Sequence, residues 1–269
     1  MSSPKNAKTG NLIAALGMVL AVVLTFIAAI TATVPYTNLI IMLLAIAVGT
    51  VIGKRLSDKV EMTGMPQLVS LFNATGGGCA MLLGLVEANQ MDPFATILGN
   101  KILLIAGLIT GAVALTGSII AERKLAGKVK DRRSKTVIFS ARILLGLMVL
   151  LPWFYFLGII PIGFTAFMYV LATLAMVYGV LFVLPIGGAD MPVVISLLNS
   201  ITGIATAFAG FVYGNKAMIA GGIFVGAAGI LLTILMCKAM NRSLMKVLAG
   251  TFKKSKTAAV EEEQDIKET

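Results

Sequence analysis

The chain has 269 residues, of which 58% are hydrophobic and only 13% are charged, and its mean hydropathy is +0.96. A soluble domain of this length has no core that could bury so much apolar surface, so the composition excludes a soluble globular protein. It predicts an all-α integral membrane protein in contact with the lipid bilayer. We attribute the net charge of +10 to membrane topology and anionic headgroups, and expect no nucleic acid partner.

Stretches without Lys, Arg, Asp or Glu predict the membrane spans. A spanning helix needs about 20 apolar residues, and turn residues at 35–38 and 158–161 divide the two longest stretches, 9–53 and 143–189. The sequence therefore predicts about eight transmembrane helices, at residues 11–32, 37–53, 66–87, 97–121, 137–156, 161–185, 192–213 and 217–238.

Basic residues predict the orientation of these helices, because they favour the cytoplasmic side of a membrane. They gather at the N-terminus, in the second and fourth connections and after the last span, whereas the opposite side has only Lys101 and Lys216. Both termini are therefore expected in the cytoplasm. We expect a cytoplasmic N-terminus at 1–10, a transmembrane domain at 11–250 and a flexible, linker-like tail at 251–269, where apolar residues become sparse.

An internal repeat divides the spans. The string MPQLVSLFN at 65–73 is echoed by MPVVISLLN at 191–199, and the two copies lie near 59–121 and 185–243. Because the copies start at the third and seventh predicted helices, they enter the membrane in the same direction. The sequence thus predicts a parallel internal repeat.

Glycine ridges extend the repeat into the next helix of each copy. Gly107 and Gly111 align with Gly222 and Gly226. Such small-residue ridges allow helices to approach closely, and ordinary helix packing is a sufficient explanation for them.

Each copy carries Ser and Asn at helical spacing on one face, as Ser70 and Asn73 in the first and Ser196 and Asn199 in the second. A buried amide without partners is costly, so we expect the two asparagines to bond to each other, to water or to another chain. Two interpretations stay open: polar contacts that hold helices together, or a polar path that holds water.

No histidine is present, so the side chain that most often moves protons near neutral pH is missing. Asp190, just before a predicted helix N-terminus, is the best internal acid, although it is equally suited to capping that helix. Glu87 and Asp92 are expected to be solvated near the outer surface. Cys79 and Cys237 suggest neither a disulfide nor a metal site, and there is no nucleotide-binding signature.

Several strings resemble the membrane region of the proton-translocating NAD(P) transhydrogenase beta subunit. They are KVEMT at 59–63, GGADMPVV at 187–194 and MCKAMNRS at 236–243. The resemblance runs from about Lys8 to Gly250. It implies a complex in which hydride passes between NADH and NADP⁺ while protons move inward across a bacterial inner membrane.

The resemblance also implies partners and cofactors. An alpha-type membrane chain, an NAD(H)-binding domain and an NADP(H)-binding domain are expected, with both nucleotides bound by the partner domains, none by this chain, and a homodimer of the whole complex. Family beta chains usually have one helix more before the matching region and an NADP(H) domain after it. We therefore expect this chain alone to be inactive in hydride transfer, with no catalytic residue of its own.

Specific residues match the family's proton path. The position of Asn73 is histidine in some members; where it is asparagine, a histidine of the alpha chain supplies the protonatable group. Asn199 and Ser118 match further polar positions of this path, beside Ser70 and Ser196. Asp190 and Arg242 match positions implicated in coupling to the NADP(H) domain.

Two other functions are compatible with the residues alone. A secondary transporter built on a parallel repeat would hold a small solute between the Ser and Asn stripes, although few charges lie within the spans to bind a coupling ion. A passive assembly subunit would need these polar residues for folding only.

Overall fold

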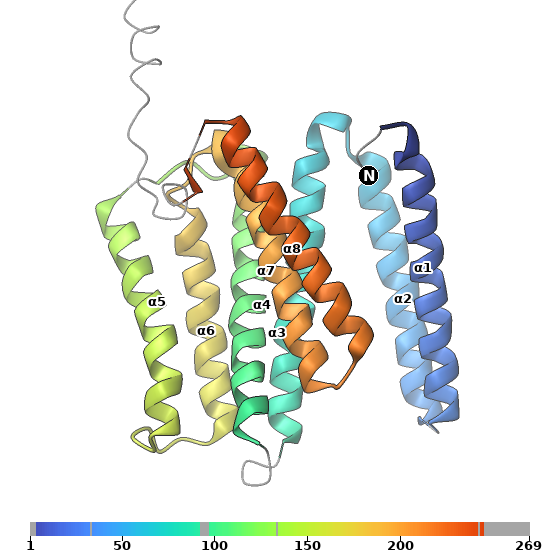
Figure 1. Cartoon of the computed structure of the whole chain (residues 1–269), viewed down its shortest axis with the longest axis horizontal. Coiled ribbons are helices and arrows are strands. Elements are labelled where there is room, and N and C mark those ends of the chain that lie inside the picture. Colours follow the sequence, from blue (N-terminus) through green and yellow to red (C-terminus); the bar gives the residue numbers. More distant parts are fainter. Residues whose placement is uncertain (1–3, 33, 92–96, 133, 242, 245–269) are drawn as a thin grey trace, which may run out of the picture. The chain divides into compact units, whose positions relative to one another are not determined.

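The computed structural model describes residues 4–32, 34–91, 97–132, 134–241 and 243–244, and the regular structure in this part of the chain is entirely helical (Figure 1). Eight of its helices are long and apolar enough to cross a membrane, which confirms the predicted all-α fold. They are α1 (Pro4–Thr31), α2 (Tyr36–Lys59), α3 (Met65–Gln90), α4 (Leu98–Leu125), α5 (Lys135–Phe156), α6 (Phe164–Val183), α7 (Met191–Val212) and α8 (Lys216–Ala239).

Several helices extend beyond the predicted spans, although α6 is shorter than its predicted span of 161–185. Helix α1 begins at Pro4 and α2 continues to Lys59, beyond the predicted ends at 11 and 53. Charged residues mark where the apolar stretch stops, but backbone hydrogen bonds continue past them, and long basic side chains can turn toward water. For α1 and α2, charge gaps therefore give the apolar part of the helix rather than its full length.

The chain divides into two compact units, one of residues 1–60 with α1 and α2, and one of residues 61–269 with α3 to α8. In the second unit, α3, α5 and α7 begin at the end of the bundle where α4, α6 and α8 finish (Figure 1). We call this end the basic end, because Arg123, Lys124, Lys128, Lys130, Arg132, Lys135 and Lys238 lie in or next to the helix termini there. Lys101 and Lys216 lie at the opposite end.

Short 3-10 turns introduce the first helix of each repeat copy. Met62–Gly64 leads directly into α3 and Gly188–Asp190 leads into α7. Pro66 and Pro192 occupy the first turn of these helices, where a missing N–H costs no hydrogen bond. At the other ends, Gly158 and Gly214 follow α5 and α7 with positive φ angles of 75° and 60°, a conformation that ends a helix and favours glycine.

The two repeat copies form helical hairpins, α3–α4 and α7–α8, held at close distance by glycine. A Cβ added to Gly77 would lie 2.7 Å from the backbone N of Leu115, and one added to Gly203 would lie 2.6 Å from the backbone N of Gly226. Lipid tails are as apolar as leucine, so these helices gain little from apolar burial alone and associate through tight contact. Glycine is therefore required on both interfaces.

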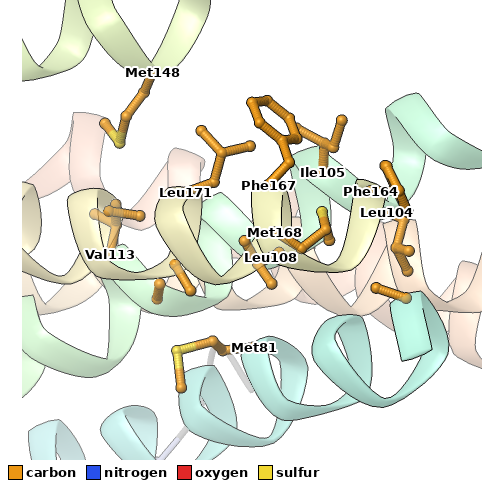
Figure 2. Packing of buried hydrophobic residues seen from close by; sticks show 14 residues of the cluster. Met81, Leu104, Ile105, Leu108, Val113, Met148, Phe164, Phe167, Met168 and Leu171 are labelled. Atoms are coloured by element: carbon orange, nitrogen blue, oxygen red, sulfur yellow. The ribbon is translucent and has the colours of Figure 1, made fainter. Parts of the chain in front are cut away.

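An apolar core fills the space between α3, α4 and α6, with Met148 contributed by α5 (Figure 2). Leu108 of α4 and Met168 and Leu171 of α6 have no exposed surface. Tyr155 stacks on Phe167 with ring centroids 4.3 Å apart. Dispersion contacts of this density hold α6 against the first hairpin.

A second core lies toward the basic end and joins α4, the end of α6 and α8 to α7 and the segment that leads into it. Its buried members are Ala121, Val183, Ile186, Met191, Val193, Val194, Ile195, Leu198 and Cys237. Because Ile186 and Met191 flank the 3-10 turn Gly188–Asp190, this core holds the turn in place from both sides.

Substitution of two adjacent glycines in α8 tests the hairpin contact. A Cβ at Gly222 would collide with the backbone of Ala207 in α7, whereas one at Gly221 would meet nothing within 4 Å. We expect Gly222→Ala to destabilise the protein by about 1–3 kcal/mol through overpacking. Gly221→Ala, the matched control, should leave stability equal or slightly higher. Thermal unfolding of the purified protein in detergent measures both, and equal melting temperatures would contradict the proposed contact.

Candidate functional site

Three polar side chains meet between α3 and α4, and we call Ser70, Asn73 and Ser118 the first polar cluster. Asn73 Nδ2 donates to Ser118 Oγ at 2.8 Å, and Ser70 Oγ donates to the backbone oxygen of Ser118 at 2.8 Å. Ser70 and Ser118 are fully buried, and Asn73 is 7% exposed. The cluster thus joins a residue of α4 to the Ser and Asn of the repeated motif.

One polar atom of this cluster lacks a partner among the described residues. Asn73 Oδ1 is buried and accepts no hydrogen bond there. Leaving such an acceptor unsatisfied costs about 1–3 kcal/mol. Taking about 1.5 Å per residue along a helix, Asn73 lies about 12 Å from the start of α3, well inside the apolar length of the bundle.

A second polar cluster, of Ser196, Ser200 and Thr233, lies between α7 and α8. The single hydroxyl hydrogen of Thr233 is shared between the Gly229 oxygen, 2.7 Å from Oγ1, and Ser196 Oγ, 3.1 Å from it. Ser196 Oγ also donates to the Gly229 oxygen at 3.2 Å, and Ser200 Oγ donates to that of Gly226 at 2.7 Å. All three side chains are buried. In this cluster every hydroxyl hydrogen has an acceptor.

The two clusters occupy corresponding places in the repeat. Lys101 aligns with Lys216, and Ser118 and Thr233 each lie 17 residues further along. Ser70 and Ser196, aligned in the first helix of each copy, both bond to the facing helix. The contact between a motif Ser and a hydroxyl-bearing second helix is therefore present in both copies.

The expectation for Asn199 is wrong in one respect, because its side chain is exposed while Asn73 is buried. The two asparagines therefore do not form a matched buried pair. In the first copy Ser118 accepts from Asn73, but in the second copy Thr233 bonds to Ser196, and Ser200 is the buried neighbour of Asn199. The repeated motif places both asparagines on the same face of their helices, but different residues pack against that face in the two copies.

Asp190 ends the 3-10 turn before α7 and is buried, with 3% of its surface exposed. Asp190 occupies the N-cap position of α7, as the capping interpretation expects, but its side chain makes no capping hydrogen bond to that helix. A buried carboxylate is costly unless its charge is compensated, so Asp190 is an unusual residue at the basic end of the bundle. Arg242, its predicted companion, lies outside the described residues.

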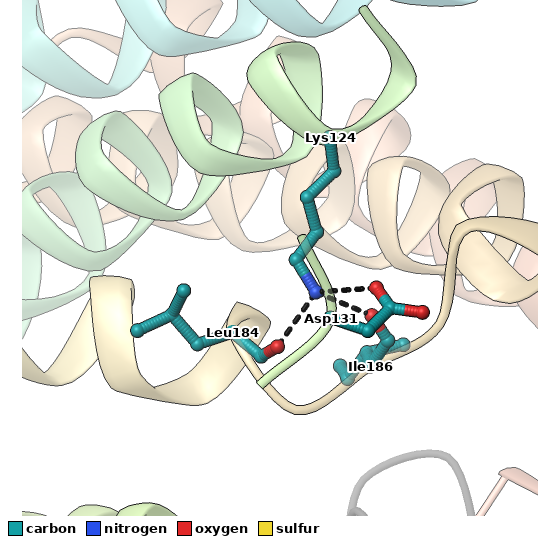
Figure 3. Close-up of polar contacts among 4 residues, drawn as sticks. All are labelled: Lys124, Asp131, Leu184 and Ile186. Carbon is teal, nitrogen blue, oxygen red and sulfur yellow. Dashed lines mark hydrogen bonds and ion pairs between the residues drawn. The ribbon is translucent and has the colours of Figure 1, made fainter. Parts of the chain in front are cut away.

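The sequence analysis treated Lys124 as one of the basic residues that set the membrane orientation, but the structure shows that its side chain has a specific place. It lies in the last turn of α4, and its side chain is only 1% exposed (Figure 3). Its ammonium donates to the backbone oxygens of Leu184 at 2.6 Å and Ile186 at 2.7 Å. It also pairs with Asp131 Oδ1 at 3.0 Å. The burial of Lys124 has a partial signal in its helix: Gly117, Ala121 and Lys124 share one face, and the first two are buried.

At the end opposite the basic end, Glu87 is half-buried rather than fully solvated. It lies near Tyr213, which follows α7. Burial raises the pKa of the Tyr213 phenol, and the neighbouring Glu87 charge raises it further. Asp92, the other acid expected here, lies outside the described residues.

These features define a class of protein: a helical protein with multiple spans, which keeps hydroxyl and amide side chains between helices that are otherwise apolar. The clusters can donate, accept and relay hydrogen bonds, but Ser, Thr and Asn do not titrate near neutral pH.

Sequence comparison identifies the family within this class. Residues 1–269 match the family described as NAD(P) transhydrogenase beta subunit. A curated protein of Rhodospirillum rubrum, NAD(P) transhydrogenase subunit beta, is 35% identical over 260 residues, which cover 94% of this chain and 54% of that protein. A protein of the same name from a designated strain of that species gives the same values.

The chain therefore belongs to the NAD(P) transhydrogenase beta subunit family, and the recognition made from its motifs is confirmed. It spans about half the length of the curated relatives that it matches.

Removal of the Ser118 hydroxyl tests the first polar cluster. Ser118→Ala leaves the Asn73 amide without its acceptor, which should destabilise the protein by about 1–3 kcal/mol. Thr75→Val is the control, because the Thr75 hydroxyl is exposed and bonds only to Phe72 of its own helix. Thermal unfolding in detergent should place Ser118→Ala below the parent and Thr75→Val beside it. A Ser118→Ala variant as stable as the parent would mean that this hydrogen bond is not formed.

Proposed function

We propose that this chain is the membrane part of an NAD(P) transhydrogenase and carries the path by which protons cross the bilayer. The observation that carries the proposal is a buried cluster of hydroxyl and amide groups, with one buried acceptor left open, inside a chain of this family. Polar groups at membrane depth are expensive and are retained where they serve a function.

In this proposal Asn73 organises the path rather than titrating. Its Nδ2 is held by Ser118, while its Oδ1 has no partner among the described residues and is available to a donor such as water or a side chain of a partner. Because the sequence has no histidine, the group that gains and loses the proton would belong to the alpha-type membrane chain. Asn199, whose side chain is exposed on α7, would face water or that partner as well.

Asp190 and Arg242 are proposed to link the path to the NADP(H)-binding domain. The buried Asp190 belongs to a short turn at the basic end, which supports a role at the surface where a nucleotide domain would dock. NAD(H) and NADP(H) would both be bound by partner domains, and none by this chain. The complete complex would transfer hydride from NADH to NADP⁺ as protons move inward, and would assemble as a homodimer.

The family match does not favour the secondary transporter. A passive assembly subunit differs from our proposal in one measurable way. It predicts that changes in the polar clusters affect stability only, and never the ratio of protons moved to hydride transferred.

Two asparagine variants test the path in the complex assembled with its partners and reconstituted in vesicles. We expect Asn73→Ala and Asn199→Ala to slow proton-coupled hydride transfer, on the order of tenfold for about 1.4 kcal/mol of lost transition-state stabilisation. Asn73→Ala should have the larger effect, since it also removes the partner of Ser118.

The control for this experiment is Thr173→Val, which changes an exposed hydroxyl that bonds only to Tyr169 of its own helix. NADH-dependent reduction of NADP⁺ is measured with and without a proton gradient. Unchanged coupled activity in both asparagine variants, with the complex intact, would rule out the proposed path.

Charge placement supports a bacterial inner-membrane topology with both termini in the cytoplasm. We expect Lys216→Cys to react with a membrane-impermeant maleimide added to intact cells, and Lys128→Cys to react only after the membrane is opened. Both positions are exposed at opposite ends of the bundle. The reverse pattern would invert the proposed orientation.

A further inference from the structure

Lys124 differs from the basic residues around it in where its charge lies. Arg123, Lys128 and Lys130 are exposed, as expected for residues that set topology. The Lys124 side chain is 1% exposed, and the carboxylate that pairs with it is 44% exposed. A lysine that only sets topology can stay in water, and burying it would cost its hydration free energy with no gain. The burial of the Lys124 ammonium therefore has a structural cause.

The ammonium has three hydrogens and three acceptors. Two of them, the backbone oxygens of Leu184 and Ile186, come directly after α6, which ends at Val183. The last carbonyls of a helix lack intrahelical partners and carry partial negative charge. Lys124 of α4 therefore caps the C-terminus of a different helix, with Asp131 completing its coordination.

The capped segment leads directly to the buried acid. Ile186, which is 1% exposed, is followed by Gly187 and by the 3-10 turn that ends in Asp190. Two successive glycines, Gly187 and Gly188, leave this stretch with few side-chain contacts of its own. Together with the apolar packing of Ile186, the bonds from Lys124 fix the point from which the turn starts.

Helix α4 also carries Ser118 of the first polar cluster. Ser118 and Lys124 are six residues apart, which is about 9 Å along a helix. One rigid element therefore contacts Asn73 through one residue and the segment before Asp190 through another.

We propose that Lys124 is a positioning residue that holds the Leu184–Asp190 segment to α4, so that a shift of α4 at the first polar cluster moves Asp190 at the basic end. The positioning role is supported by the contacts of Lys124 themselves and does not depend on the proposed function. Its part in coupling rests on the proposed function, namely that the polar cluster and Asp190 belong to one proton-coupled cycle.

A cysteine reporter measures the positioning directly in the assembled complex. Ile186→Cys is buried and should react slowly with a water-soluble maleimide, whereas Ala189→Cys is exposed and should react rapidly. Lys124→Met should accelerate labelling of the Ile186 reporter by at least about tenfold, because loss of the charged hydrogen bonds favours local opening. The Ala189 reporter should keep its rate. The parent without an added cysteine supplies the background from Cys79 and Cys237.

Matched variants separate positioning from general loss of folding. Lys128→Met removes an exposed basic residue of the same segment and should leave both reporters unchanged. Lys124→Arg should restore slow labelling in part, since it keeps the charge and the donors. Asp131→Asn, which keeps the two carbonyl bonds, should have a smaller effect than Lys124→Met. If Lys124→Met does not assemble, Asp131→Asn and Lys124→Gln decide the question by the same measurement.

Failure of this inference is distinguishable from failure of the proposed function. An unchanged labelling rate of the Ile186 reporter in the Lys124 variants would overturn the positioning role and leave the proton path untouched. If labelling rises, the number of protons moved per hydride should fall in Lys124→Met and not in Lys128→Met. A faster reporter with an unchanged ratio would overturn the coupling role of Lys124, and silent asparagine variants would overturn the path itself.

Discussion

Close approach of helix backbones at glycine is the constraint on which the other contacts depend. An apolar side chain gains little free energy when it moves from lipid to a helix interface, because both are apolar. Membrane helices are therefore held together by tight contact and by the few polar groups that reach each other. Gly77 and Gly111 lie against the facing backbone in the hairpin of α3 and α4. Only at that separation can Asn73 and Ser70 bond to a serine of the neighbouring helix without a long side chain. The polar cluster is thus a consequence of the packing of the membrane helices.

Duplication has kept the skeleton of this hairpin and changed its chemistry. Each copy retains the first-turn proline, the glycine contacts and a motif serine bonded to the second helix. The first copy adds a buried amide with an open acceptor, while the second satisfies its hydroxyls within the hairpin and exposes Asn199. A symmetric frame therefore carries two polar clusters that differ in whether a buried acceptor lacks a partner among the described residues.

Sequence reasoning gave the number of helices, because charge gaps, proline and glycine act locally and their effect does not depend on the rest of the fold. It proposed Ser70, Asn73 and Ser118 for one path, partly through family resemblance, and the structure brings these three residues into contact. It did not predict that Asn199 is exposed while Asn73 is buried, because helical spacing says which residues share a face but not which neighbouring helix covers that face. It missed Lys124 for a related reason: a lysine in a basic segment looks like its neighbours until the carbonyls of Leu184 and Ile186, some 60 residues away, are brought against it.

The unequal surroundings of α4 and α8 have a consequence for how the two copies tolerate a change of side-chain size. Helix α4 packs against α3, α6 and α7, whereas its counterpart α8 packs mainly against α7 and presents Phe224, Leu231 and Leu235 on an exposed face. Within this chain, a change of side-chain size in α4 therefore meets neighbours on three helices, whereas on that face of α8 it meets few. The two copies of the repeat thus differ in how strongly the rest of this chain constrains their second helix, since α4 is packed from three sides and α8 mainly from one.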